Sequence, residues 1–294
     1  MDTNETDFSA KEINVVIFDS SVTSIGNDAF RGFSSITEIK IPNSLVSIGS
    51  WSFEKCSSLS QITIPSLVTS IGTGAFSGCS SLVKITVQSS LTAIESNTFN
   101  GCSSLKEISL PSSVTSIGSQ AFEGCTSLEH IQIQSVTTIY NCAFRGCTAL
   151  KEITVPSVTM IGNYAFEGCS SLEDITMPSG ALVGNGAFNE CPLNSETLCN
   201  KIRDQIMKDK LESIALPGYL QRISSSAFRD CRSLKEVKIP SSVTSIGEHA
   251  FFRCSSLTSI TIPSSVTSIG YEAFSGCSSL TSITIPSSVT SIGN

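Results

Sequence analysis

The sequence has few of the groups that catalysis or nucleic-acid binding requires. Its 294 residues include only two histidines and one tryptophan, and 25 Asp and Glu outnumber 18 Lys and Arg, which gives a formal net charge of -7. Affinity for nucleic acid comes largely from Lys and Arg that neutralise phosphates, so this balance argues against a nucleic-acid partner. The sequence also has no apolar run of roughly 20 residues, the length of a membrane-spanning helix, so we expect no membrane insertion.

Motifs of common active sites and metal sites are missing too. The phosphate-binding pattern G-x-x-x-x-G-K-[ST] does not occur. Cys142 and Cys199 belong to no C-x-x-C pair or other zinc spacing. A reactive thiol would need a nearby base, and the chain has only two histidines that could serve as one, His130 and His249. We therefore expect no enzyme activity, no metal and no cofactor.

What the sequence does contain is a repeat. One phenylalanine recurs 23 residues apart from Phe30 to Phe122, then 22 apart to Phe188, and again from Phe228 to Phe274. The unit L-x-x-I-x-I-P-S-S-V-T-S-I-G-x-x-A-F-x-G-C-S-S appears almost unchanged in residues 257–279. Eleven full units and the start of a twelfth fit the chain. A fixed period of this length is typical of solenoids.

Each part of the unit has a structural reason. In L-x-x-I-x-I the apolar residues alternate with polar ones, as in a half-buried strand. The proline that follows has no N–H and ends the strand. V-T-S-I is a second short segment, and G-x-x-A-F-x-G-C is a helical turn that buries Ala, Phe and Cys. These features predict a β-rich α/β solenoid, with a parallel β-sheet on one face and short strands, turns and helical turns on the other.

The same motifs carry a family resemblance. With Cys-Ser-Ser-Leu, Ile-Thr-Ile-Pro, Val-Thr-Ser-Ile-Gly and Ala-Phe in order, residues 13–193 and 211–294 resemble BspA-like leucine-rich repeats. That class is typical of microbial surface and secreted proteins that adhere to host or matrix proteins. The resemblance therefore implies a protein-binding, adhesive scaffold at the cell surface or in secreted form. Residues 1–12 are a polar tail without the features of a secretory signal, which favours a cytoplasmic location if Met1 is the true start.

One segment interrupts the repeat. Residues 194–210 read as an amphipathic helix, with Leu198, Ile202 and Ile206 on one face and a possible N-cap at residue 194 or 195. Two interpretations stay open: a helix packed on the solenoid flank or over the seam between repeat blocks, or a protruding docking helix or hinge. The chain is then a tail (1–12), repeat block 1 (13–193), the helix (194–210) and repeat block 2 (211–294), whose last repeat is incomplete.

Ten of the twelve cysteines occupy the repeat position itself. In-register side chains point the same way, and cysteine is a small residue that is often buried. We expect these cysteines to be reduced, structural thiols. The alternative is disulfides between neighbouring coils, which lie close enough for such a bond.

The variable positions of L-x-x-I-x-I should form one exposed sheet face. In the outer units these positions have no distinctive side chains, whereas in the central units many of them are charged. Their mixed charges either neutralise one another in solvent or form a polar recognition surface for a protein partner. The candidate site residues are Lys84, Lys106, Glu107, Glu129, His130, Gln132, Lys151, Glu152, Glu173, Asp174, Lys235, Glu236 and Lys238.

Two other functions remain as alternatives. The near-identical terminal units and the incomplete last repeat fit a structural protein that self-associates at an uncapped C-terminal repeat. A threonine row could also bind ordered water or ice, although Ser109, Gln132, Ala215 and Lys238 interrupt it. Its threonines are Thr63, Thr86, Thr154, Thr176, Thr261 and Thr284.

Overall fold

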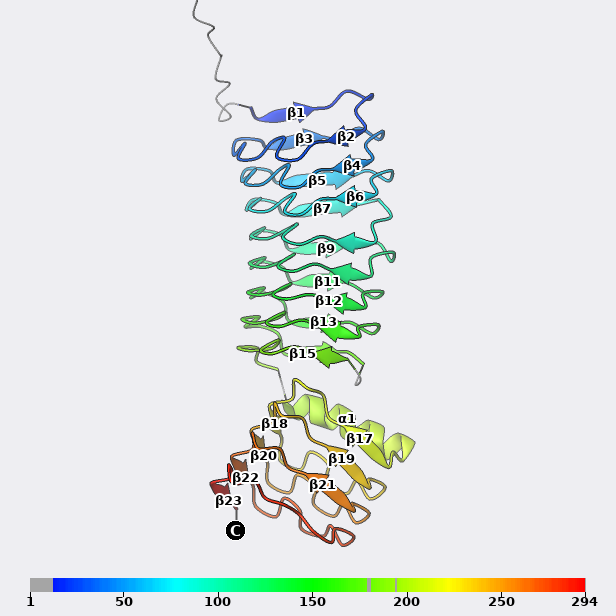
Figure 1. Ribbon diagram of the computed structural model, residues 1–294, viewed down its shortest axis with the longest axis vertical. Coiled ribbons are helices and arrows are strands. Elements are labelled where there is room, and N and C mark those ends of the chain that lie inside the picture. Colours follow the sequence, from blue (N-terminus) through cyan, green and yellow to red (C-terminus); the bar gives the residue numbers. More distant parts are fainter. Residues whose placement is uncertain (1–12, 179–180, 194, 294) are drawn as a thin grey trace, which may run out of the picture. The chain divides into compact units, whose positions relative to one another are not determined.

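The computed structural model describes residues 13–178, 181–193 and 195–293. The chain divides into two compact units, Met1–Pro192 (unit 1) and Leu193–Asn294 (unit 2), and each is described by itself. Both are stacks of coils whose strands pair in parallel with the strands of the next coil (Figure 1). This is the predicted β-solenoid.

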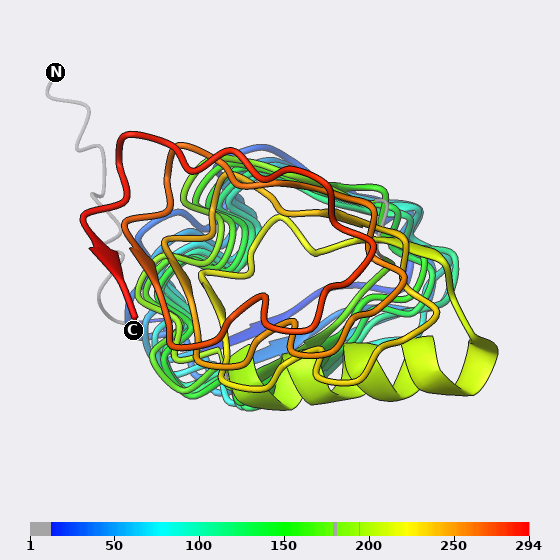
Figure 2. The same ribbon diagram turned by 90° about the horizontal axis from the view of Figure 1, so that it is seen from below.

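Unit 1 contains two columns of short strands. The first column follows the L-x-x-I-x-I segments: β1 (Val15–Ile17), β3 (Glu38–Lys40), β5 (Gln61–Ile64), β7 (Lys84–Val87), β9 (Glu107–Ser109), β11 (His130–Gln132), β13 (Glu152–Thr154) and β15 (Asp174–Thr176). The second follows the V-T-S-I segments: β2 (Ser24–Ile25), β4 (Ser47–Ile48), β6 (Ser70–Ile71), β8 (Ala93–Ile94), β10 (Ser116–Ile117), β12 (Thr138–Ile139), β14 (Met160–Ile161) and β16 (Leu182–Val183). Viewed along the stack in Figure 2, the coils of unit 1 superimpose closely, so this stack is nearly straight.

Unit 2 repeats the arrangement after one helix. Its elements are α1 (Ser195–Asp209), the first-column strands β17 (Ser213–Ala215), β19 (Glu236–Lys238) and β21 (Ser259–Thr261), and the second-column strands β18 (Arg222–Ile223), β20 (Ser245–Ile246), β22 (Ser268–Ile269) and β23 (Ser291–Ile292). Among the described residues, no helix is long and apolar enough to cross a membrane.

A ladder of stacked phenylalanines runs through the core of each unit. From Phe30 to Phe188, successive rings lie 5.1 to 5.8 Å apart between centroids and nearly parallel. Phe228, Phe251 and Phe274 continue the pattern in unit 2. Most of these side chains are fully buried. Each ring therefore loses its contact with water only because a neighbouring coil lies against it.

The G-x-x-A-F-x-G-C segment, which we expected to be a helical turn, forms separate hydrogen-bonded turns. The Arg31 N–H donates to the Asp28 carbonyl at 3.1 Å, while the Phe30 N–H donates to the Ser52 carbonyl of the next coil at 2.7 Å. Asp28 and Gly32 have positive φ, and the same two positions do so in the other coils. Left-handed residues interrupt a helix, so the backbone bonds here run between coils and the segment stays flat enough to stack.

The strands of unit 1 stay intact where the repeat shortens to 22 residues. The first column is paired in three groups, β1-β3, β5-β7-β9-β11 and β13-β15, and the second in two, β2-β4-β6 and β8 to β16. Two of these three interruptions fall between coils that are 23 residues apart, so the shorter repeat is not their common cause. The core is unaffected, because the rings of Phe122 and Phe144 still stack with centroids 5.2 Å apart.

Helix α1 is part of the core of unit 2. Cys199 and Ile206 are fully buried, and Leu198 and Ile202 pack partly against the same cluster. The helix contacts β18, in the first coil of the unit. It is therefore packed on its own unit and does not protrude. Arg203, on the same helix, is half-buried.

Replacing a ring in the middle of the ladder should weaken the stack. Phe122→Ala leaves a cavity between two coils, and we expect it to lower the free energy of unfolding by about 3–5 kcal/mol. Leu67→Ala, at a side chain that is 57% exposed, is the control and should change it by less than about 0.5 kcal/mol. Urea unfolding followed by circular dichroism measures both, and equal effects would contradict the shared core.

The packing of α1 has its own test. Ile206→Ala should destabilise the first coil of unit 2 by about 2–5 kcal/mol, whereas Met207→Ala, at a half-exposed neighbour, should have little effect. Hydrogen exchange followed by mass spectrometry should then show faster exchange in residues 211–233 and no change in residues 105–171. Unchanged exchange in residues 211–233 would argue against the packing described.

Candidate protein-binding face

The first strand column of unit 1 presents a polar face to solvent. In strands such as β9 and β11 the middle isoleucine is buried and its two neighbours are exposed. The alternation places variable residues of successive coils beside one another. We call residues 83–86, 106–109, 129–132, 151–154 and 173–176 the sheet face of unit 1, meaning their outward side chains.

Ten of the predicted site residues lie on this face. All are exposed except Asp174, which is half-buried. Parallel pairing places Lys84 beside Glu107, and Glu107 beside His130. The ten are Lys84, Lys106, Glu107, Glu129, His130, Gln132, Lys151, Glu152, Glu173 and Asp174.

The other three predicted residues, Lys235, Glu236 and Lys238, belong to unit 2. All three are exposed on or next to β19. The Nζ atom of Lys235 lies 2.8 Å from Oε1 of Glu212, so its charge is already paired. Lys238 is in register with Ala215 and Thr261, which carry no charge. The charged face is thus concentrated in unit 1.

The lysines of the sheet face of unit 1 are not held in ion pairs within the described part of the chain. Among the described residues, Lys84, Lys106 and Lys151 form no ion pair within 4.0 Å. On β13 and β15, Glu152 is directly in register with Asp174. Like charges opposite one another in a sheet are destabilising. This end of the face is therefore acidic.

A shallow depression lies in the middle of this face. Its lining is Val83, Lys84, Lys106, Glu107, Glu129 and His130. Five of these six residues were predicted from the sequence as site residues. The sixth, Val83, is 44% exposed and adds an apolar contact. The depression thus combines both signs of charge with a small apolar area, a composition suited to a polar protein interface.

Comparison with known proteins identifies the repeat. The family profile of the BspA type leucine rich repeat region matches residues 3–111, 92–207 and 201–294, which together cover nearly the whole chain. The chain belongs to the BspA-type leucine-rich repeat family.

Two solved structures of leucine-rich repeat proteins resemble this chain. A leucine-rich repeat protein from Bacteroides ovatus is 31% identical, with a TM-score of 0.54, and the match covers 96% of this chain and 75% of that one. A leucine rich cell surface protein from Faecalibacterium prausnitzii is 26% identical, with a TM-score of 0.53, over 96% of this chain and 87% of that one. No protein with a curated description matches the chain.

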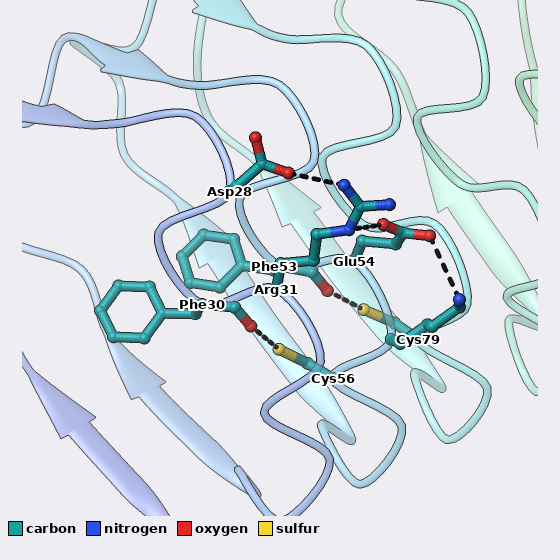
Figure 3. Close-up of polar contacts among 8 residues, drawn as sticks. Asp28, Phe30, Arg31, Phe53, Glu54, Cys56 and Cys79 are labelled. Carbon is teal, nitrogen blue, oxygen red and sulfur yellow. Dashed lines mark hydrogen bonds and ion pairs between the residues drawn. The ribbon is translucent and has the colours of Figure 1, made fainter. Parts of the chain in front are cut away.

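The recurring cysteine of this BspA-type repeat acts as a buried hydrogen-bond donor. The Sγ atom of Cys56 lies 3.3 Å from the carbonyl oxygen of Phe30, and Cys79 makes the same contact to Phe53 at 3.2 Å (Figure 3). Equivalent bonds continue along both units. All twelve cysteines are free thiols. Cysteine is thus small enough for the core and still satisfies a carbonyl of the preceding coil.

Burial makes these thiols poor nucleophiles. It raises the pKa of Cys56 to about 12 and that of Cys231 to about 11, and it also raises the pKa of Cys102 and Cys125. The thiolate is the reactive form. Within the described ranges, no group of three His, Cys, Asp or Glu side chains is placed to hold a metal ion.

The sequence interpretation missed one feature, a cluster of arginines and aromatic rings in unit 2. Arg229, Phe252 and Arg253 lie at or next to the position that follows the repeat phenylalanine. In the repeat unit A-F-x-G-C that position is an unspecified x. A signal was available, because two arginines and a second phenylalanine occur there in consecutive units.

Thiol reactivity checks the cysteine ladder. With a thiol-specific disulfide reagent at pH 8, we expect rapid reaction of Cys142 and Cys191, the two partly exposed cysteines, and reaction of the rest only after unfolding in urea. Cys142→Ser should remove part of the rapid phase, whereas Cys102→Ser should not. Rapid labelling of most of the twelve thiols would show that the ladder is open to solvent.

Proposed function

We propose that this chain is a non-catalytic adhesion and protein-binding scaffold whose partner docks on the sheet face of unit 1. The carrying observation is the row of exposed charged side chains there, on strands whose inward residues are buried. Three of them, Lys84, Lys106 and Lys151, form no ion pair within 4.0 Å in the part of the chain that the structure describes. Such side chains project from a backbone that is already ordered, so a partner does not have to order it.

The charge pattern indicates the chemistry of the partner. The region from β7 to β9 carries both signs, whereas β13 and β15 bring Glu152 and Asp174 into register and add Glu173 nearby. A partner with basic groups over β13 and β15 would relieve this repulsion. Groups that cost stability in the free protein and gain from binding are typical of functional surfaces.

Family membership supports the same proposal. One relative is described as a cell surface protein, which fits an adhesive role for this chain as well. The buried thiols, whose pKa values are raised by burial, fit a scaffold better than an enzyme. The water-binding alternative has less support, because the row Thr63, Thr86 changes to Ser109 and then Gln132 in register.

The test compares two sets of charge changes of equal size in overlapping coils. The face variant is Glu107→Gln, Glu129→Gln and Glu152→Gln. The control variant is Glu95→Gln, Glu123→Gln and Glu167→Gln, on the turn side of the coils. The probes are immobilised fibronectin, laminin, fibrinogen and type I collagen, with binding measured by biolayer interferometry.

For a matrix protein that binds the natural chain, the face variant should weaken binding by about tenfold or more and the control variant by less than about twofold. Glu152→Gln alone should leave the midpoint of urea unfolding unchanged or raise it, because it removes a like-charge contact. Equal losses in the two triple variants, or no binding to any of the four proteins, would count against the proposal.

A further inference from the structure

Unit 2 carries a second cluster on the turns that follow its second strand column. It combines guanidinium groups with aromatic rings, residue types that dominate binding energy at protein interfaces. We call it the turn face of unit 2 and define it by Arg229, Arg232, His249, Phe252, Arg253 and Tyr271.

Two guanidinium groups flank one ring in this cluster. The Cζ atom of Arg229 lies 4.8 Å from the centroid of the Phe252 ring, and that of Arg253 lies 5.0 Å from it. Arg229 occupies the same repeat position as Phe252, one coil earlier. His249 packs edge-on against both Phe252 and Tyr271. The rings therefore hold the arginine side chains in place by cation–π contacts.

The positive charge of the cluster is only partly neutralised. Asp230 accepts an ion pair from Arg232 at 3.0 Å and lies 3.7 Å from Arg229. Across the described part of the chain, Arg253 forms no ion pair within 4.0 Å. Arg229 and Arg232 thus share one carboxylate, and Arg253 has none within this distance among the described residues.

The other carboxylate of the cluster, Glu272, is already engaged. One of its oxygens lies 3.2 Å from Nε2 of His249, and the other accepts a hydrogen bond from the Tyr271 hydroxyl at 2.9 Å. It is therefore placed to hold the two rings, and not to neutralise Arg253.

The same repeat position in unit 1 is organised differently. Arg145 lies between Glu167 of the next coil, at 2.8 Å, and Glu123 of the previous one, at 3.7 Å. Arg31 is likewise paired with Glu54 and Asp28 (Figure 3). In unit 2 the residues at this repeat position in the two coils after Arg229 are Phe252 and Ser275. Carboxylates from neighbouring coils that would neutralise the arginine are replaced by a ring and a hydroxyl.

We propose that the turn face of unit 2 binds an acidic polypeptide segment that also carries aromatic side chains. A guanidinium stacked on a ring keeps its N–H edge free, and this edge matches a carboxylate in a bidentate geometry. The rings of Phe252 and Tyr271 supply apolar area beside it. In a chain with a net charge of -7, a local excess of arginine is a site for a negatively charged partner.

The composition of the cluster favours a peptide over a sulfated polysaccharide. A polysulfated chain is attracted to a continuous row of cations and is repelled by carboxylates. Here Asp230 and Glu272 interrupt the arginines, and the aromatic rings occupy the area between them. This surface lies on a different unit from the sheet face of unit 1, so variants of one do not alter the other.

The test uses the full chain and a fluorescein-labelled 12-residue peptide of alternating Glu and Tyr, with binding measured by fluorescence anisotropy at low and at physiological salt. The control peptide has Gln in place of Glu. The decisive variant is Arg229→Gln with Arg253→Gln. The matched control is Arg31→Gln with Arg145→Gln, which removes two positive charges from unit 1 at the repeat position that Arg229 occupies in unit 2. Thermal melting checks that the variants are folded.

We expect the Glu-Tyr peptide to bind the natural chain, to bind the Arg229 and Arg253 variant about tenfold or more weakly, and to bind the control variant within about twofold of the natural chain. Phe252→Leu should also weaken binding, because it removes the ring that holds both guanidinium groups. Equal binding of the Gln-Tyr peptide, or equal losses in both arginine variants, would overturn the proposal. A heparin fragment is tested in the same way. If the Arg229 and Arg253 variant lost binding to heparin but not to the Glu-Tyr peptide, the proposal would be overturned in favour of a sulfated glycan.

Discussion

Contact between successive coils is the interaction on which this structure depends. A single coil presents Leu, Ile, Phe and Cys on one side and has too few residues to enclose them. The phenyl rings become buried because the rings of the neighbouring coils lie against both of their faces. Hydrogen bonds also run between coils, along the stack. Turn N–H groups donate to carbonyls of the next coil, and cysteine thiols donate to carbonyls of the preceding one. Burial and hydrogen bonding thus stabilise one arrangement together.

Stacking also brings equivalent positions of successive coils together into continuous surfaces. Residues 23 or 22 apart become neighbours, so the variable strand residues of unit 1 form one face and the residues after each phenylalanine form another. Because the core restricts the inward positions to a few residue types, chemical variety is left to these outward columns. The two units use them differently, with mixed and acidic charges on the strands of unit 1 and arginines with aromatic rings on the turns of unit 2.

Helix α1 shows how an interruption is accommodated in such a stack. Its buried residues, Cys199 and Ile206, join the same cluster as the coil that follows. The helix therefore supplies apolar contacts to the first coil of unit 2, as a neighbouring coil does elsewhere. Its apolar spacing was visible in the sequence, but the core it joins was not, because three apolar residues on a helix fit several partners.

By itself, the sequence determined the period, the parallel strands, the inward residues and the outward positions of the sheet face, since a half-buried strand alternates and a repeat forces equivalent residues into register. The tertiary structure alone decided the rest: the left-handed residues such as Asp28 that replace a helical turn, the pairing break between β11 and β13, the thiol-to-carbonyl bonds, and the meeting of Arg229 with Phe252. Each of these depends on distances between coils. A sequence pattern states which residues are equivalent, whereas the twist and spacing of the stack decide which of their atoms come into contact.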